Sequence, residues 1–232
     1  MTQHVQVRGM ALSKSQPRED QPLVIIVDDD IAVREALREL ILSAGMWPAC
    51  FASTRELLGG ADALDQPGCL ILDVRMPGAS GLDLQRQLSA SGNPKPVIFL
   101  TGHGDIPMTV QAMKSGAVDF LTKPVRDQTL LDAVRAAIER DVAQRAKASV
   151  VERTVARLET LTPREREAMA EVARGRLNKQ IAFDLGISEV TVKLHRSNVM
   201  RKMQVMSVGE LIRAWEALPA DKRNREVRQH SF

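Results

Sequence analysis

The stretch LVIIVDDD, residues 23–30, is an apolar run of five residues that ends in three consecutive aspartates. A second apolar run, residues 69–72, ends in the same way at a single aspartate, Asp73. Short runs rich in Val, Ile and Leu are typical of strands that are buried on both faces of a parallel sheet. Because the carboxyl ends of neighbouring parallel strands open onto one crevice, we expect Asp28, Asp29 and Asp73 to converge in space.

A cluster of carboxylates at this edge indicates a cation site. Clustered carboxylates raise one another's pKa unless a cation neutralises them. Hard oxygen ligands with room for water suit Mg²⁺, and Mn²⁺ prefers similar ligands. Asp30 falls in the first turn of the next expected helix, where a carboxylate favours the helix dipole, so it is expected to cap that helix. The sequence therefore predicts an Mg²⁺ or Mn²⁺ site beside a nucleophilic aspartate.

The strand-then-helix pattern recurs along the first half of the chain. Apolar positions at helical spacing follow the first strand as far as Gly45, and Ser53 with Glu56 forms a capping box that opens a second, short helix. Five such units predict an α/β fold, a doubly wound parallel sheet with helices on both faces. The expected strands are residues 23–27, 47–51, 69–72, 97–100 and 118–121.

Length, composition and charge suggest two domains with different surfaces. The 232 residues suffice for two small domains, each with its own core. Aromatic residues make up 3% of the chain and Tyr is absent, which favours α/β and helical packing over an all-β module. Residues 1–126 carry 12 Lys and Arg against 14 Asp and Glu, whereas residues 127–232 carry 20 against 15. The basic second half suggests nucleic acid as a partner, although ordinary solvated surfaces show such an excess too.

The cysteines and the apolar segments do not suggest a metal cluster or a membrane anchor. Cys50 and Cys69 lie far apart in strand-like stretches, so both are expected to be small buried side chains. The longest apolar runs are far shorter than the roughly 18 residues that span a bilayer, and the N-terminus lacks the apolar centre of a signal peptide. We therefore expect a cytoplasmic protein without membrane association.

The second half carries the signals of a small all-α domain. Thr162 and Glu165 form a capping box ahead of its first helix. Gly186 and the N-cap residue Ser188 separate the second and third helices, as in a helix-turn-helix. The expected helices are residues 163–174, 178–185, 189–203 and a fourth that begins at Ser207.

Four short motifs follow the predicted strands in order: VDD at residues 27–29, LDVRMPG at 72–78, LTGHGD at 100–105 and FLTKP at 120–124. Together they resemble the CheY-like receiver domain of two-component response regulators, and the second and third are similar to those of its FixJ branch. Each motif alone is a weak signal, but their order and their placement at the ends of strands one, three, four and five are very specific.

The resemblance implies a role for each residue of the predicted site. Asp73 would be the phosphoacceptor. Asp28, Asp29 and Asp73 would hold Mg²⁺ together with the backbone carbonyl of Arg75, with Asp28 acting mostly through water. Lys123 would pair with a phosphoryl oxygen from the opposite side.

The resemblance also implies a switch that reads the phosphoryl group. Thr101 would hydrogen-bond a phosphoryl oxygen, and Phe120 would turn inward after phosphorylation, although Phe120 also fits as an ordinary core residue of its strand. The helix at Ile106–Ser115 and the fifth strand would then pair two receivers. Phosphorylation would therefore produce a homodimer.

The stretches LTPRERE at residues 161–167 and NKQIAFDLGISEVTVKLHRSN at 178–198 resemble the LuxR/NarL/FixJ DNA-binding domain. The resemblance implies that the recognition helix lies in the major groove. Ser197 stands where NarL-like members often carry a basic residue. The operator sequences of those members therefore cannot be assigned to this chain. The expected contacts are Lys193, Leu194 and Ser197 to base edges, and Lys179, Thr191, Arg196 and Arg201 to phosphates.

These expectations divide the chain into five parts. Residues 127–158 could form one long helix or two helices with a flexible joint, and the sequence leaves both open. The parts are a flexible leader at residues 1–22, a receiver at 23–140, a helical linker at 141–158, a helix-turn-helix domain at 159–218 and a flexible basic tail at 219–232.

The predicted function is that of a two-component response regulator and DNA-binding transcription factor, not an enzyme. A sensor histidine kinase would phosphorylate Asp73, which would switch dimerisation and promoter binding, and RNA polymerase is a further candidate partner. One alternative is a constitutive helix-turn-helix protein whose receiver is only a scaffold. Another is an aspartyl-phosphate phosphohydrolase, but haloacid-dehalogenase-like enzymes require a second aspartate where Arg75 stands.

Overall fold

The computed structural model describes residues 21–60, 62–92, 95–102 and 104–227 of the chain. Nearly all of the expected leader therefore lies outside the described residues, as does the end of the expected tail. The described residues fold into two compact units, and the division falls between Gln144 and Arg145. Each unit has hydrophobic core clusters of its own.

The first unit is built on one parallel sheet. Its strand order is β2-β1-β3-β4-β5, and every neighbouring pair is parallel. The predicted five-stranded doubly wound sheet is thus confirmed, with one-residue shifts where strands three and five begin and where strands four and five end. The strands are β1 (Leu23–Val27), β2 (Trp47–Phe51), β3 (Gly68–Leu72), β4 (Val97–Thr101) and β5 (Asp119–Thr122).

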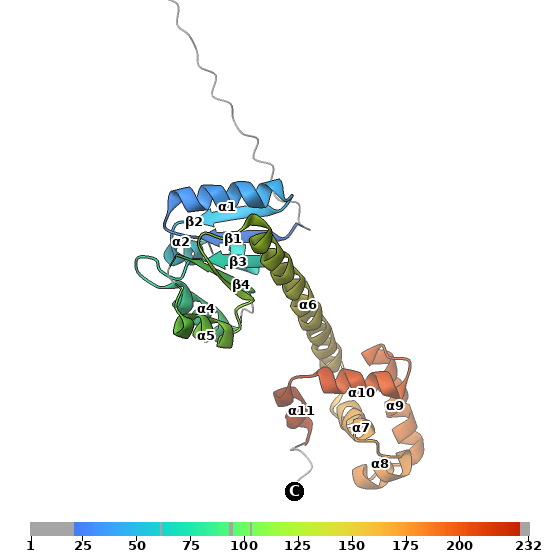
Figure 1. The fold of residues 1–232 in the computed structure, drawn as a ribbon. Helices are drawn as coiled ribbons and strands as arrows, with labels where there is room; N and C mark the ends of the chain where they lie inside the picture. Colours follow the sequence, from blue (N-terminus) through green and yellow to red (C-terminus); the bar gives the residue numbers. More distant parts are fainter. Residues whose placement is uncertain (1–20, 61, 93–94, 103, 228–232) are drawn as a thin grey trace, which may run out of the picture. The chain divides into compact units, whose positions relative to one another are not determined.

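Helices cover both faces of the sheet, because successive strand residues point to opposite sides (Figure 1). Val24 and Ile26 pack with α1 (Ile31–Ser43) and the first half of α6 (Asp127–Glu159). Leu23, Ile25 and Val27 pack on the opposite face. The helices there are α2 (Thr54–Gly59), α3 (Asp62–Asp65), α4 (Gly81–Ala90) and α5 (Ile106–Lys114).

The predicted capping signals are confirmed at the ends of these helices. The Asp30 side chain accepts a hydrogen bond from the Ala32 backbone N–H at 2.8 Å, so Asp30 caps α1 as expected. Gly45 follows the end of α1 with a left-handed φ of 75°, which glycine adopts without strain. The Ser53 side chain caps α2 by accepting from the Glu56 N–H.

The segment whose continuity the sequence leaves open is a single helix, α6, of 33 residues. Its first turns bury Leu130 and Val134 against the sheet, and its last turn buries Leu158 in the core of the second unit. The turns between them, residues 145–150, bury almost no side chain.

The second unit is entirely helical, as predicted. Its core joins the end of α6 to Met169, Ile181, Val192 and Leu211. One helix, α11, occupies part of the segment for which we expected a flexible tail. The helices are α7 (Pro163–Ala173), α8 (Asn178–Leu185), α9 (Glu189–Met203), α10 (Val208–Ala217) and α11 (Ala220–Val227).

Among the described residues, none of the helices has both the length and the apolar character needed to cross a bilayer.

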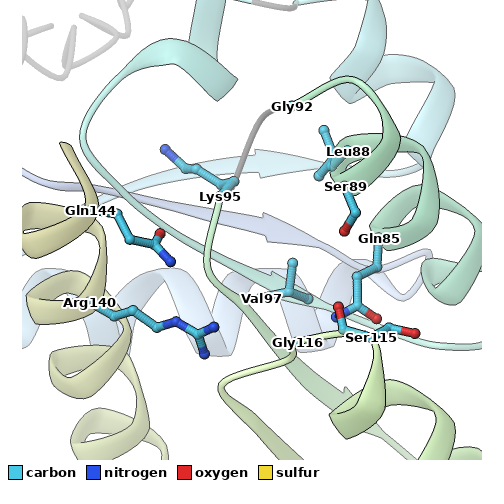
Figure 2. A pocket seen from close by; sticks show the side chains of 10 residues that line it. All are labelled: Gln85, Leu88, Ser89, Gly92, Lys95, Val97, Ser115, Gly116, Arg140 and Gln144. Atoms are coloured by element: carbon cyan, nitrogen blue, oxygen red, sulfur yellow. The ribbon is translucent and has the colours of Figure 1, made fainter. Parts of the chain in front are cut away.

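A cavity of about 260 Å³ lies in the first unit beside α4 and α6, near the residues that precede β4 and β5 (Figure 2).

Candidate functional site

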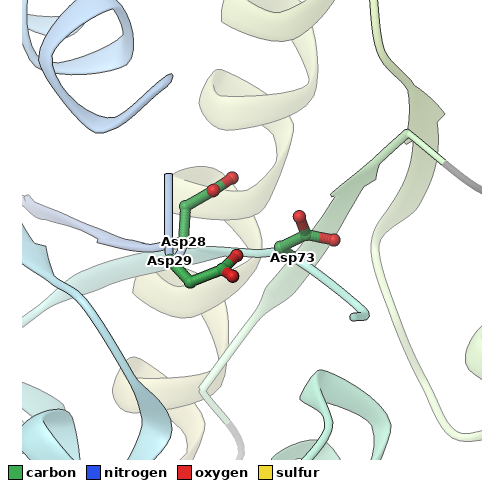
Figure 3. Close-up of side chains that lie close together, drawn as sticks. All are labelled: Asp28, Asp29 and Asp73. Carbon is green, nitrogen blue, oxygen red and sulfur yellow. The ribbon is translucent and has the colours of Figure 1, made fainter. Parts of the chain in front are cut away.

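The three aspartates of the predicted cation site converge at the carboxyl edge of the sheet. Val27 and Leu72 pair directly as the last residues of β1 and β3, so the residues that follow them are neighbours. One carboxylate oxygen each of Asp28, Asp29 and Asp73 lies within 4.8 Å of the others (Figure 3). Asp28 and Asp73 are buried and Asp29 is exposed.

Lys123, which follows β5 at the same carboxyl edge of the sheet, completes this cluster. Its Nζ lies 2.5 Å from Asp28 Oδ2 and 3.0 Å from Asp73 Oδ2. Its backbone N–H donates to the carbonyl of Thr101 at 2.8 Å, which fixes the loop after β5 against the end of β4. One ammonium group therefore bridges two of the three carboxylates.

Burial and the neighbouring charges shift the pKa values of Asp28 and Lys123. Burial raises the pKa of Asp28, the nearby Asp73 charge adds to this, and bonds from Lys123 and the Asp30 N–H oppose it. Burial alone would lower the pKa of Lys123, but its hydrogen bonds and charge interactions with Asp28 and Asp73 outweigh that and raise it. A group of anions held in this way favours a cation beside it.

Backbone and side-chain donors orient the carboxylates. The Arg75 N–H donates to Asp73 Oδ1 at 3.1 Å, and the Asp30 N–H donates to Asp28 Oδ1 at 3.0 Å. The Arg34 guanidinium donates to the Asp28 backbone carbonyl at 2.6 Å. Arg34 is not among the predicted site residues, although its position one turn into the helix after the aspartates could have pointed to it. The predicted ligation by the Arg75 carbonyl stays a prediction.

Two glycines that are not among the predicted site residues shape the site. A Cβ at Gly81, the first residue of α4, would lie 2.3 Å from the Asp73 carbonyl oxygen. A Cβ at Gly104 would lie 2.8 Å from the Phe120 ring. The contact at Gly81 is with the backbone, so α4 begins this close to Asp73 only because the residue lacks a side chain, whereas a side chain at Gly104 would require the Phe120 ring to move.

The two predicted switch residues differ in burial. Thr101, the last residue of β4, is 1% exposed. Phe120 in β5 is partly buried, and its ring centroid lies 5.9 Å from that of Phe99. Phe120 therefore packs at the edge of the core in this structure, which fits both of the roles considered for it.

The donor set fits a divalent cation. Three carboxylates supply hard oxygen ligands, and the exposure of Asp29 leaves one side of the cluster open to water. Mg²⁺ and Mn²⁺ both match these ligands, whereas the described residues place no thiol or imidazole in the cluster.

The second unit contains the predicted helix-turn-helix. Gly186 ends α8 in a left-handed conformation with a φ of 64°, and Ser188 caps α9 by accepting from the Thr191 N–H. Five of the seven predicted DNA contacts are exposed. These are Lys179 on α8 and Lys193, Leu194, Ser197 and Arg201 on α9.

The other two predicted DNA contacts already have partners within the unit. The Thr191 hydroxyl lies 2.9 Å from the Ser188 hydroxyl in the cap of α9. The Arg196 guanidinium donates to Asn178 Oδ1 at 2.6 Å, which ties α9 to the start of α8. Arg196 therefore helps to hold the two helices together, whereas Thr191 stabilises the start of α9.

Glu165 is expected to make the stability of the second unit depend on pH. It is 4% exposed, and its Oε2 accepts from the Thr162 N–H at 2.9 Å and from Lys202 Nζ at 2.6 Å. Burial opposes its charge, but these bonds outweigh that and hold its pKa below the usual value. Glu165→Gln should therefore lower the free energy of unfolding by about 1–3 kcal/mol near neutral pH. A depressed pKa stabilises the fold above the unfolded pKa, so this loss should shrink as the pH falls through the folded pKa.

The measurement is urea unfolding of the full chain, followed by Trp215 fluorescence in a Trp47→Phe background. Glu159→Gln is the control, because Glu159 forms only an exposed ion pair with Lys222 and should cost less than about 1 kcal/mol. Equal losses for the two variants, or a loss that does not change with pH, would contradict the role of Glu165.

An acidic, lysine-bridged site at the carboxyl edge of a five-stranded parallel sheet, joined to a helix-turn-helix unit, defines a response regulator of the two-component class. The family model of the response regulator receiver domain matches residues 24–135. The model of bacterial regulatory proteins of the luxR family matches residues 159–215. Both matches agree with the two units of the fold.

Known proteins resemble the chain over most of its length. Nodulation protein W of Bradyrhizobium diazoefficiens is 49% identical over 207 residues, 89% of this chain and 91% of that protein. Response regulator protein TodT of Pseudomonas putida is 50% identical over 196 residues, 84% of this chain and 86% of TodT. The structure of response regulator StyR matches with a TM-score of 0.74 and 45% identity, covering 84% and 98% of the two chains.

The chain therefore belongs to the family of two-component response regulators with a LuxR-type DNA-binding domain. The resemblance to the FixJ branch is confirmed, since transcriptional regulatory protein FixJ of Azorhizobium caulinodans is 44% identical over 190 residues, 82% of this chain and 90% of that protein. Membership of this family of transcription regulators also excludes the phosphohydrolase considered above.

Proposed function

We propose that Asp73 accepts a phosphoryl group from a phosphohistidine of a sensor histidine kinase. The observation that carries this proposal is the burial of the Asp73 carboxylate between a lysine and two further aspartates at the end of β3. An Asp73 oxygen forms a bond to phosphorus while the phosphorus–nitrogen bond breaks. The electron pair of the phosphorus–nitrogen bond returns to the imidazole nitrogen of the kinase. The imidazole then takes up a proton and is again neutral histidine.

The neighbouring residues prepare the nucleophile and receive the product. The Arg75 N–H holds one oxygen of Asp73, which leaves the other, Oδ2, beside Lys123 Nζ. After transfer Lys123 exchanges part of this interaction for a phosphoryl oxygen, and Thr101 donates its hydroxyl to another. Asp28, Asp29, Asp73 and the Arg75 carbonyl would hold Mg²⁺ or Mn²⁺. A bound cation supplies charge neutralisation as two anions approach each other.

The phosphoryl group changes the surface formed by α5 and β5. Three apolar side chains of α5 are exposed there: Ile106 is 80% exposed, and Val110 and Met113 are 44% exposed each. Apolar residues clustered on one helix favour a protein partner. Phe120 turns inward as Thr101 moves toward the phosphoryl group, and the α5 and β5 surfaces of two copies then pair.

The second unit carries the output of the switch. The exposed side chains of α9 enter the major groove of promoter DNA, and a dimer places two such helices on paired half-sites. We assign the receiver to residues 23–140, the helical linker to 141–158 and DNA binding to 159–218. A chain that meets both a sensor kinase and promoter DNA works in the cytoplasm, where RNA polymerase is a further partner.

The dimer is tested by sedimentation velocity of the full chain with Mg²⁺ and acetyl phosphate at micromolar concentration. The wild-type chain should pass from monomer to dimer when the phosphodonor is added. Val110→Glu should remain monomeric although Asp73 is still phosphorylated, because a charge would be buried in the interface. Gln111→Glu, at the next exposed position of α5, should dimerise as the wild type does. A phosphorylated wild-type chain that stays monomeric would refute this mechanism.

A further inference from the structure

The cavity beside α4 and α6 lies away from the acidic cluster. The residues that line it near the sheet, Lys95 and Val97 at the start of β4 and Ser115 ahead of β5, belong to the amino ends of their strands. The aspartates lie at the carboxyl ends. In Figure 2 side chains of α4 and side chains of α6 line opposite sides of this cavity.

Gln85 contributes a buried acceptor to the wall. The residue is 3% exposed, and its Nε2 donates to the carbonyls of Ala112 at 3.4 Å and Ser115 at 3.2 Å. These two bonds fix the orientation of the carboxamide, so the remaining atom, Oε1, must be the acceptor. Oε1 is buried and has no hydrogen-bond partner among the described residues. Because such atoms are normally satisfied, a donor outside the described residues is needed.

The α6 side of the cavity adds a second acceptor and a cation. Gln144 Oε1 is likewise buried without a partner among the described residues. The Arg140 guanidinium lines the same space, and within the described part of the chain it forms no ion pair or hydrogen bond. Figure 2 shows both side chains directed from α6 toward β4.

The other charged groups nearby are engaged with the backbone. Lys95 is 5% exposed and donates to the Gln66 carbonyl. Asp141, which is buried on α6, accepts from the Gly68 N–H at 2.8 Å and so anchors this helix beside the cavity. Among the described residues that line the cavity, the charged ones are Lys95 and Arg140, so the charge of its lining is positive.

We propose that this cavity binds a small organic acid that also carries a hydrogen-bond donor. The carboxylate pairs with Arg140, and the donor satisfies a carboxamide oxygen of Gln85 or Gln144. The volume of about 260 Å³ is below the usual range for drug-sized ligands, which restricts the site to small molecules. Because α6 continues from here into the second unit, such a ligand would give the chain an input separate from Asp73.

The test is isothermal titration calorimetry of the full chain with three probes of matched size. 3-Hydroxybutyrate has both groups, butyrate lacks the donor and 1,3-butanediol lacks the carboxylate. The hydroxy acid should bind at least about tenfold more tightly than butyrate, because a site with unpaired polar atoms discriminates against a ligand that cannot pair them. The diol should give no saturable heat.

Two variants assign the binding to this cavity. Arg140→Gln should weaken binding of 3-hydroxybutyrate at least about tenfold, since it removes a charge-assisted hydrogen bond. Arg135→Gln changes an exposed arginine elsewhere on the same helix and should bind as the wild type does. In carboxamide NMR spectra, the signals of Gln85 and Gln144 should shift on binding. No saturable binding by the wild type, equal affinities for the hydroxy acid and butyrate, or wild-type affinity in Arg140→Gln would overturn the proposal, leaving a cavity that holds water only.

Discussion

Replacing Asp73 by asparagine is expected to abolish phosphorylation of the chain. Wild-type protein incubated with Mg²⁺ and acetyl phosphate should acquire one phosphoryl group per chain, measured by intact mass. An amide is neutral and a poor nucleophile, so Asp73→Asn should remain unlabelled although the lysine and the two other aspartates are intact. The expected effect is the complete loss of the modification, because the acceptor atom itself is removed.

A matched control separates this effect from a general change in charge. Asp62 is an exposed aspartate of the same unit, on α3, and Asp62→Asn should be labelled at the wild-type rate. Labelling of Asp73→Asn at the wild-type rate would place the phosphoacceptor elsewhere. If both variants lost the label, the overall charge of the receiver would be responsible and not one nucleophile.

DNA binding by the full chain is expected to weaken steeply with salt. A dimer that neutralises six to ten phosphates releases about as many counterions, so raising the salt from about 50 to about 200 mM should lower its affinity by roughly 10³-fold or more. Lys179→Ala should weaken binding to all sequences alike and reduce the salt slope by about one for each phosphate that the lysine no longer neutralises. The measurement is fluorescence anisotropy with a labelled duplex over a salt series.

Two further variants sharpen this prediction. Lys193→Ala should cost about 1–3 kcal/mol on a preferred duplex and much less on a mixed sequence, because it removes a hydrogen bond to a base edge. Arg38→Ala removes an exposed positive charge from α1 of the first unit and should leave the salt slope unchanged. Affinity that does not depend on salt would contradict the assignment of α8 and α9 to DNA.

Much of the fold and of the site follows from local sequence. The run at residues 23–27 reads as a strand because its apolar side chains cover both faces, and capping residues such as Asp30 and Ser53 mark where helices begin. The convergence of Asp28 and Asp73 follows from parallel strands together with the pairing of β1 and β3.

Other features depend on tertiary interactions that no local pattern encodes. The bridge from Lys123 to two aspartates joins residues that are 95 and 50 positions apart. Gly81 matters because of one carbonyl oxygen on a different element. The continuity of α6 could not be predicted because the side chains of its middle turns pack against no core, so the pattern of burial lapses there.

The second unit shows the same limit. Arg196 looks like a phosphate-binding residue because it is a basic residue of the recognition helix, yet its guanidinium is bonded to Asn178. Helix α11 lies where a charged sequence suggested a tail, and its Lys222 forms an ion pair with Glu159. In both cases a tertiary partner decides what a charged side chain does.

Phosphorylation of Asp73 should raise the affinity of the chain for DNA, and a titration of DNA measures this change. A duplex enriched from a random pool by the phosphorylated chain is titrated with wild-type protein and with Asp73→Asn, each with Mg²⁺ and with or without acetyl phosphate. We expect the phosphodonor to raise wild-type affinity at least about tenfold, or about 1.4 kcal/mol, and to leave the affinity of the variant unchanged. Equal wild-type affinities with and without the phosphodonor would contradict this expectation and favour a constitutive DNA-binding protein with an inert receiver.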